Sequence, residues 1–338
     1  MRGAPLPSFR PRLLFMRRLA LLLASVVVVI PATARAAPDA VPGARTAAAP
    51  TLRLELRPEI GISGGTETYE LSARNIGFAV GSKLTYPVDV PLAGGRATAS
   101  YGAFAVALSF HTGLGQPSGT MVDSDYVGTT EFSHTESRVT AKLWSAELAG
   151  RMRVAELAET AGALPLSLVL GFRHAANAWD VHGASGWQGL TRRVSVSIPD
   201  GVHALHYTST YEIAFFGARL DGHLGESVRL SSEARLLSAW SQHEDDHLIR
   251  AKRGTASVHA LGWSLSGEIA WTLAGPLFLG AYGEVQMLSG SDLLKQRFYA
   301  DDPGTPDSVE GPGTSIPDTL FSYRSDRWMA LGFVGVAF

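Results

Sequence analysis

Apolar and polar side chains alternate with a period of two residues along several segments of the chain. Between residues 261 and 273, six odd positions carry Leu, Trp or Ile, and four even positions carry Ser, Glu or Thr. The same alternation occurs in residues 164–173, 227–236 and 334–338. Because successive side chains of a β-strand point to opposite faces, the pattern predicts strands with one apolar face and one polar or small face.

Strands of this kind fit either a soluble β-sandwich, whose apolar faces pack on each other, or a transmembrane barrel, whose apolar face meets lipid. Three features favour the barrel. The polar faces carry charged residues, as a hydrated or ion-paired lumen allows; these are Arg229, Glu233, Arg235, Glu268 and Glu284. Tryptophans lie toward the ends of the apolar faces, where an interfacial girdle is expected; these are Trp240, Trp263 and Trp271. The chain also ends on an aromatic residue of an apolar face, Phe338.

The lengths of the connections predict the number of strands. Short connections fall near residues 98–102, 158–163, 222–226 and 272–276, and longer polar stretches fall near 72–81, 115–137, 181–204, 243–256 and 291–320. Four short and five long connections in alternation give ten strands with both termini on the short-turn side. The predicted fold is therefore all-β, a ten-stranded antiparallel transmembrane β-barrel with long extracellular loops. Its lumen is only slightly wider than that of a filled eight-stranded barrel, which argues against a wide solute pore.

The first residues have the pattern of a secretory signal peptide. Four arginines between positions 10 and 18 precede a twelve-residue apolar run, Leu19 to Ile30, and Ala34-Arg35-Ala36 fits the small-x-small cleavage pattern. A membrane anchor is the alternative, but the run is too short for a bilayer, which needs about 20 residues. We therefore expect a signal peptide over residues 1–36, a flexible leader over 37–50 and the barrel over 51–338.

Composition narrows the possible partners. Residues 1–36 hold six of the 29 basic residues and no acid, which leaves 23 basic against 31 acidic residues and a net charge of −8. This balance argues against nucleic acid as a partner. The chain has no Cys, so stability must come from a closed hydrogen-bonded sheet rather than from disulfides.

Two acidic clusters carry the most specific chemistry of the sequence. One holds Asp123 and Asp125, and the other holds His243, Asp245 and His247. Counting alternate positions along the neighbouring strands places these side chains on the inward face, at the end with the long connections. In that arrangement His247 acts as a general base oriented by Asp245, and the two aspartates of the first cluster hold and polarise a water. A solvated charged loop and a low-affinity Ca²⁺ contact are the alternatives.

The sequence resembles the omptin family of outer-membrane endopeptidases over residues 51–338. The matching segments are Ile62-Ser63-Gly64-Gly65-Thr66-Glu67, Lys83-Leu84-Thr85-Tyr86, Met121-Val122-Asp123-Ser124-Asp125-Tyr126, Thr135-Glu136-Ser137-Arg138 and Asp245-Asp246-His247. The resemblance implies an aspartyl-type peptidase without a metal or other cofactor, whose catalytic residues are Asp123, Asp125, Asp245 and His247. It also implies a monomer in the outer membrane of a Gram-negative cell, with the active site on the extracellular side, peptide or protein substrates, and activation by lipopolysaccharide.

The sequence departs from the family at the substrate pocket and at the lipid site. Family members cleave between basic residues, which they bind with a Glu on the first strand and an Asp two residues before the catalytic Asp. Glu67 matches the first position and His243 occupies the second, so we expect both in substrate binding, with a weaker preference for basic residues. The stretch corresponding to the lipid site, residues 172–176, lacks the motif's Glu and second Arg, and Val139 stands where well-known members have His. A non-catalytic barrel of the same ancestry, acting as an adhesin or structural protein, is the alternative function.

Overall fold

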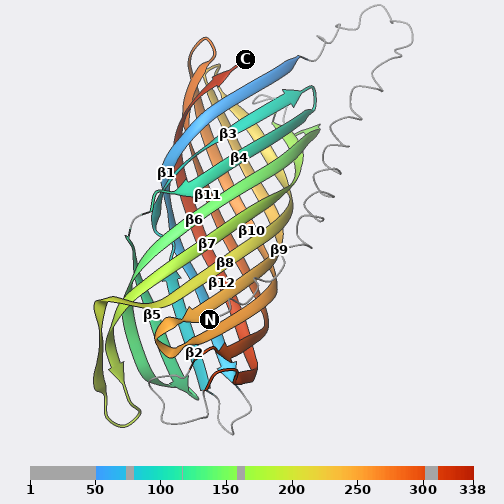
Figure 1. Cartoon of the computed structure of the whole chain (residues 1–338). Coiled ribbons are helices and arrows are strands. Elements are labelled where there is room, and N and C mark those ends of the chain that lie inside the picture. The colour runs from blue at the N-terminus through green and yellow to red at the C-terminus, as the bar shows by residue number, and fades with distance from the viewer. Residues whose placement is uncertain (1–50, 74–79, 116, 158–163, 301–310) are drawn as a thin grey trace, which may run out of the picture. The chain divides into compact units, whose positions relative to one another are not determined.

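The computed structural model describes residues 51–73, 80–115, 117–157, 164–300 and 311–338, without the side chains of residues 317 and 318. Within these ranges it has twelve strands and one short 3-10 helix (Figure 1). The elements are β1 (Leu52–Ala73), β2 (Val80–Pro87), β3 (Val90–Tyr101), β4 (Phe104–Gly113), β5 (Pro117–Val127), β6 (Thr130–Glu156), β7 (Pro165–Gln188), β8 (Val194–Leu224), β9 (Val228–His247), η1 (Leu248–Arg250), β10 (Lys252–Ala274), β11 (Leu277–Phe298) and β12 (Ser315–Ala337). No helix in these ranges is long and apolar enough to cross a membrane. The predicted signal peptide and leader lie in residues 1–50, outside the described part of the chain.

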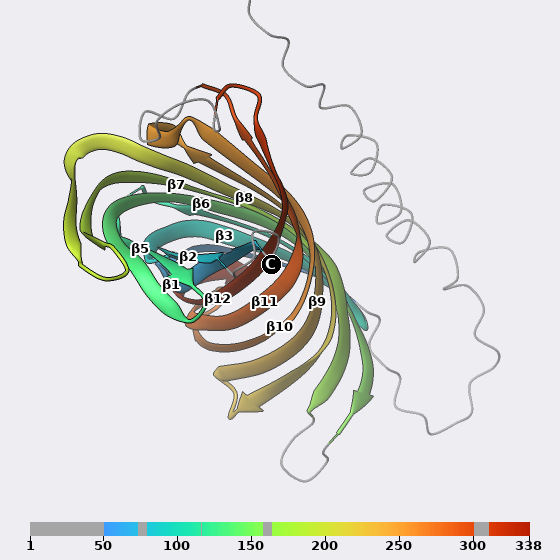
Figure 2. The ribbon, with the colours of Figure 1, turned by 90° about the horizontal axis from the view of Figure 1, so that it is seen from below.

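The strands close into one antiparallel barrel (Figure 2). β12 pairs with β1 along most of its length, which joins the first and last strands of the ring. β2 and β3 both pair with β1 and are separated only by Val88 and Asp89, so together they form one barrel strand. β4 and β5 both pair with β6 and form another. The twelve segments therefore make ten barrel strands, which confirms the predicted fold class.

The connections alternate between the two ends of the barrel as predicted. At one end, tight turns join β3 to β4, β8 to β9 and β10 to β11, and each contains a glycine with a positive φ: Gly102 at 59°, Gly225 at 64° and Gly275 at 55°. The C-terminus lies at this end, where the Phe338 amide donates a hydrogen bond to the carbonyl of Leu54 at 2.8 Å. β1, β5, β7, β9 and β11 have their C-terminal ends at the other end of the barrel, which we call the mouth (Figure 1).

The polar stretches at the mouth are mostly strand rather than loop. Residues 115–137, expected as one loop, contain all of β5 and the start of β6 around a turn at Gly128, and residues 181–204 largely continue β7 and β8. Backbone pairing continues beyond the membrane, where both faces of the sheet meet water and the apolar alternation is lost. The sequence thus predicts the positions of these connections correctly and their lengths wrongly.

An apolar belt surrounds the outside of the barrel nearer the turn end. On β1 the large outward residues from Leu52 to Ile62 are apolar and exposed, and Trp240, Trp263 and Trp271 face outward as predicted. The belt ends at the mouth side with an aromatic rim, which includes Trp144 on β6, Trp240 on β9 and Trp328 on β12. Aromatic girdles mark the edges of the membrane-spanning part of such barrels. Residues on the mouth side of this rim therefore lie outside the membrane.

Paired charges fill the lumen behind the apolar belt. Arg173 contacts Glu284 at 2.9 Å and Glu147 at 2.7 Å, and Arg235 contacts Glu147 at 3.0 Å. These four side chains are largely or fully buried. The ion-paired interior expected from the charged inward positions is confirmed.

Candidate active site

The two acidic clusters meet at the mouth of the barrel, although they come from different walls. β9 carries Asp245 and His247, β5 carries Asp123 and Asp125, and β8, β7 and β6 lie between them in the hydrogen-bonded order. A cleft of about 440 Å³ is lined by Asp123, Asp125 and His247. Strand parity therefore predicts the inward direction of these side chains correctly.

The backbone of β9 presents a carboxylate and an imidazole side by side. Asp245 and His247 are two residues apart on one face of the strand, and their Oδ2 and Nε2 atoms are 2.9 Å apart. β9 ends at His247, where η1 and the positive φ of Ala251, 48°, turn the chain into β10. Asp245 is buried behind the imidazole, which itself opens onto the cleft. This is the arrangement expected for a general base held by a carboxylate.

Asp245 is held in its ionised form. Burial alone would raise its pKa, but the charge and hydrogen bond of His247 and a hydrogen bond from the Tyr69 hydroxyl outweigh burial and lower the pKa below its usual value. Tyr69 and His247 both bind Oδ2, and among the described residues Oδ1 has no hydrogen-bond partner. Lys252, opposite His247 in the β9–β10 ladder, adds a favourable charge.

Asp123 has the opposite electrostatic environment. Burial and the neighbouring charge of Asp125 raise the pKa of Asp123 to about 7, against partial compensation by His247 and by a hydrogen bond of 3.3 Å from the Ser82 hydroxyl. Two adjacent carboxylates resist double ionisation, so the pair retains a proton near neutral pH. The site thus combines an ionised carboxylate on β9 with a partly protonated pair on β5.

An aromatic cluster lies beneath Asp245, whose carboxylate binds the Tyr69 hydroxyl, and we call this cluster the aromatic floor. The rings of Tyr86 and Tyr207 stack with centroids 4.6 Å apart, and Tyr69 and Trp179 each lie 5.2 Å from Tyr207. Burial raises the pKa of Tyr69 and of Tyr207 well above the usual value, with a further contribution from acidic neighbours, so both phenols stay neutral. Tyr86 belongs to a segment that resembles the omptins, but the contact between Tyr69 and Asp245, 176 residues apart, has no local sequence signal.

The two residues expected to bind substrate lie beside this floor. Glu67 is fully buried and forms an ion pair with Arg327 as well as a hydrogen bond with the Tyr211 hydroxyl. His243 is buried between the Tyr207 hydroxyl, 2.8 Å from Nδ1, and the Ser241 hydroxyl, 2.9 Å from Nε2. Burial lowers the pKa of His243 to about 3, so its imidazole is neutral.

The stretch compared with a lipid site, residues 172–176, lies on β7, next to the strand β6 that carries the family-like segment 135–138, and their charged residues are divided between the two faces of the barrel. Glu136 and Arg138 lie on the outer wall, with half or more of each side chain exposed. Arg173, in contrast, points into the lumen and pairs with Glu147 and Glu284, because odd positions of β7 face inward. Val139 is buried on the inner face. Glu136 and Arg138 therefore present charges to the outside, whereas Arg173 does not.

Comparison with known proteins supports the fold. No protein-family model matches the sequence, and no curated protein matches it significantly. Among solved structures, the barrel is similar to the outer membrane protease OmpT from Escherichia coli, with a TM-score of 0.69 and 14% identity over 85% of this chain and 97% of that chain. The TodX monoaromatic hydrocarbon channel, at 10% identity over 84% of this chain and 90% of that chain, has a TM-score of 0.23, too low to carry an argument. The protein therefore has an omptin-like fold, a barrel of the outer-membrane type.

Proposed function

We propose that this protein is an omptin-like endopeptidase of the outer membrane, with its mouth on the extracellular side. The observation that carries the proposal is the Asp245–His247 pair, which opens onto the same cleft as Asp123 and Asp125. The cleft lies outside the apolar belt, where a peptide chain can reach it from water. The paired charges in the lumen below it argue against a wide solute pore as the competing function.

In the proposed reaction, His247 activates a water. The Nε2–H group of the imidazole donates its hydrogen bond to Asp245, so Nδ1 is the nitrogen that accepts a proton from a water in the cleft. As the water oxygen attacks the peptide carbonyl, the imidazole becomes positively charged, and the ionised Asp245 stabilises that charge. Tyr69 fixes the carboxylate by binding the same oxygen.

Asp123 and Asp125 hold the water and the developing charge. Asp125 accepts a hydrogen bond from the water, while a protonated Asp123 donates one to an oxygen in the cleft. A donor of this kind stabilises the oxyanion that forms when the carbonyl is attacked. The raised pKa of Asp123 supports this role, because an ordinary Asp would be ionised at neutral pH and could only accept. The proton taken by His247 then passes to the leaving amine.

The substrate pocket favours peptides without a strict requirement for basic residues. Arg327 neutralises Glu67, and His243 is uncharged, so this part of the site carries no net negative charge for a Lys or Arg side chain. Aromatic rings surround His243, with Tyr323 at 4.5 Å and Phe321 at 5.0 Å between centroids. We expect cleavage near neutral or apolar side chains to compete with cleavage near basic ones.

The remaining expectations concern the membrane. The apolar belt supports a monomeric barrel surrounded by outer-membrane lipid, because its outer face meets lipid on all sides. Lipopolysaccharide is proposed as an activator rather than a cofactor, with Glu136 and Arg138 as the outer-wall charges that would contact it. Arg173, engaged in the lumen, is not proposed for this contact.

A peptide-library assay tests the proposal. The refolded barrel in detergent micelles is incubated with a mixed peptide library, with and without lipopolysaccharide, and the products are identified by mass spectrometry. We expect internal cleavage by the native chain and none by His247→Ala. If the correctly folded native chain cleaves no peptide under either condition, the enzyme assignment is wrong and the non-catalytic barrel is the better description.

A further inference from the structure

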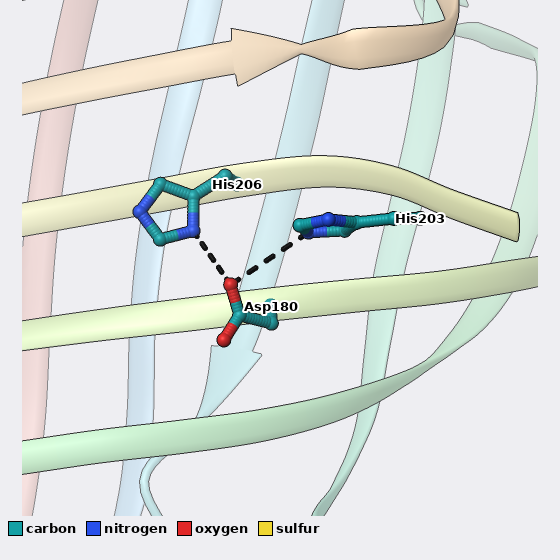
Figure 3. A group of neighbouring side chains, drawn as sticks. All are labelled: Asp180, His203 and His206. Carbon is teal, nitrogen blue, oxygen red and sulfur yellow. Dashed lines mark hydrogen bonds and ion pairs between the residues drawn. The ribbon is translucent and has the colours of Figure 1, made fainter.

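A second group of ionisable side chains lies on the outer wall of the barrel, away from the candidate active site. Asp180 on β7 and His203 and His206 on β8 point toward one another (Figure 3). They lie on the mouth side of the aromatic rim. His174 lies at the rim, with its ring centroid 4.8 Å from that of Trp144, and Asp180 is six residues, about 20 Å along the strand, beyond His174. Their side chains are 21%, 39% and 37% exposed, so ions in water can reach them.

The donor atoms of this group converge on one point. His206 Nδ1 lies 2.7 Å and His203 Nε2 lies 3.7 Å from the same carboxylate oxygen, Oδ1 of Asp180. All three donor atoms lie within 4.8 Å of one another. Tetrahedral Zn²⁺ with bonds of about 2.1 Å requires donors about 3.4 Å apart, which is within a small side-chain rotation of these distances.

We propose that Asp180, His203 and His206 bind a divalent transition-metal ion, and that Zn²⁺ matches the site best. Two imidazoles and one carboxylate are ligands that suit Zn²⁺ and disfavour Mg²⁺ and Ca²⁺, which prefer oxygen ligands only. Three protein ligands on an exposed wall leave the fourth position for water.

Neighbouring side chains hold the three ligands in position, which supports a metal site rather than a chance contact. Lys142 donates to the other oxygen of Asp180, Oδ2, at 3.1 Å, which fixes the carboxylate and leaves Oδ1 directed at the histidines. His182 stacks on His203 with ring centroids 4.7 Å apart and holds that imidazole against the sheet. Partners of this kind orient metal ligands in known sites.

The position of the site gives a bound ion a mechanical effect. The β7–β8 ladder is irregular next to the ligands, with register shifts on both sides of His182 and a positive φ at Gly183, 62°. Beyond this irregularity, residues 184–202 form an outer hairpin whose inner face lines the cleft, and Val181 and Leu205 line it from beside the ligands. A metal ion that joins β7 to β8 here would fix the base of the hairpin and so the wall of the cleft.

Zinc titration of tag-free, full-length protein in micelles tests the proposal. We expect isothermal titration calorimetry to detect one Zn²⁺ per chain, and His203→Ala and His206→Ala each to weaken binding by more than about tenfold. Hydrogen exchange in residues 184–202 should slow on adding Zn²⁺ to the native chain and stay unchanged in both variants. These measurements do not depend on whether the protein cleaves peptides.

His174→Ala is the matched control. His174 contacts Glu212 at 2.8 Å across the same two strands, so it is a histidine–carboxylate pair on the outer wall without a second histidine. Zinc binding should be unchanged in this variant. No measurable binding by the native chain, or an equal loss in His174→Ala and His206→Ala, would overturn the proposal.

Discussion

The lumen within the apolar belt and the mouth above it hold similar ionisable residues in opposite arrangements. In the belt region, each of Glu147 and Glu284 contacts at least one buried arginine. At the mouth, Asp123 and Asp125 share a cleft with each other and with His247. Burial and the charge of Asp125 raise the pKa of Asp123, whereas a close cationic partner such as arginine would lower it. Burial is common to both regions, so it does not distinguish them.

The difference lies in whether the charges are matched. A buried carboxylate with an arginine partner is stabilised and chemically inert, because its proton affinity is low and its lone pairs are occupied. A carboxylate pair without such a partner keeps a proton and exchanges it near neutral pH, which is what acid–base chemistry requires. We infer that the lower network supports the barrel and that the mouth carries the activity.

The largest expected effect is the loss of activity when the dyad is neutralised. Asp245→Asn preserves the shape of the side chain but removes the charge that holds His247, so we expect peptide cleavage to fall by about 10³–10⁴-fold. A difference in electrophoretic mobility between unheated and heated samples should show that the barrel still forms. Activity within tenfold of the native protein would contradict the assignment of this pair as the catalytic base.

The next effect concerns stability and uses the lumen network. Arg235→Gln leaves Glu147 and Glu233 without one of their buried partners, which should lower the free energy of unfolding by about 3–5 kcal/mol. Urea unfolding followed by tryptophan fluorescence measures the change. Arg253→Gln at the mouth is the control, because the Arg253 side chain is 52% exposed and pairs with Asp246 at 2.6 Å, a contact worth about 0–1 kcal/mol. Equal losses in the two variants would remove the contrast between the regions.

Much of the fold can be predicted from the sequence because the membrane imposes a simple rule on the strands. Leu261, Trp263 and Leu265 must face lipid, so their alternation is strict and predicts β10 directly. Residues 115–137 obey no such rule, since both faces of the sheet are wet there, and the extension of β5 and β6 is not visible. The break at Val88 and Asp89, which divides one barrel strand into β2 and β3, is also missed.

Only strand parity and the family resemblance predict parts of the candidate site from the sequence. Parity gives the inward direction of Asp123 and Asp245, but it gives no contact between strands that are far apart in the ring. The hydrogen bond from Tyr69 to Asp245 and the ion pair between Glu67 and Arg327 both depend on closure of the barrel. These contacts decide the charge of the site, and so its chemistry, without any local pattern.

A smaller effect is expected on substrate preference. His243→Asp adds a negative charge beside the aromatic floor, where the native imidazole is neutral, and should raise kcat/KM for a peptide with Arg at the cleavage site by about tenfold relative to a neutral peptide. His243→Asn, which is polar but uncharged, is the control and should leave the ratio unchanged. Paired kinetic measurements on two peptides that differ at one residue give the ratio directly. A native enzyme that already prefers Arg by 100-fold would show that the pocket charge is not set by Glu67, Arg327 and His243.

The smallest effect is the pH dependence of stability that Asp123 should cause. The folded protein raises the pKa of this carboxyl from its usual 3.8 to about 7, so the unfolded chain releases the proton first as pH rises. Stability therefore falls between about pH 4 and pH 7 and stays constant above that range.

Asp123→Asn cannot ionise and loses this dependence. Because the open cleft hydrates the carboxylate as it ionises, we expect the variant to gain only about 1 kcal/mol at pH 8, or about 2–4 °C in melting temperature. The comparison of both proteins at pH 5 and pH 8 measures the titration of Asp123 together with its neighbours in the cleft, since groups elsewhere affect both proteins equally. A matched carboxylate such as Glu147 should show no such gain on neutralisation, and its Gln variant should lose stability at both pH values.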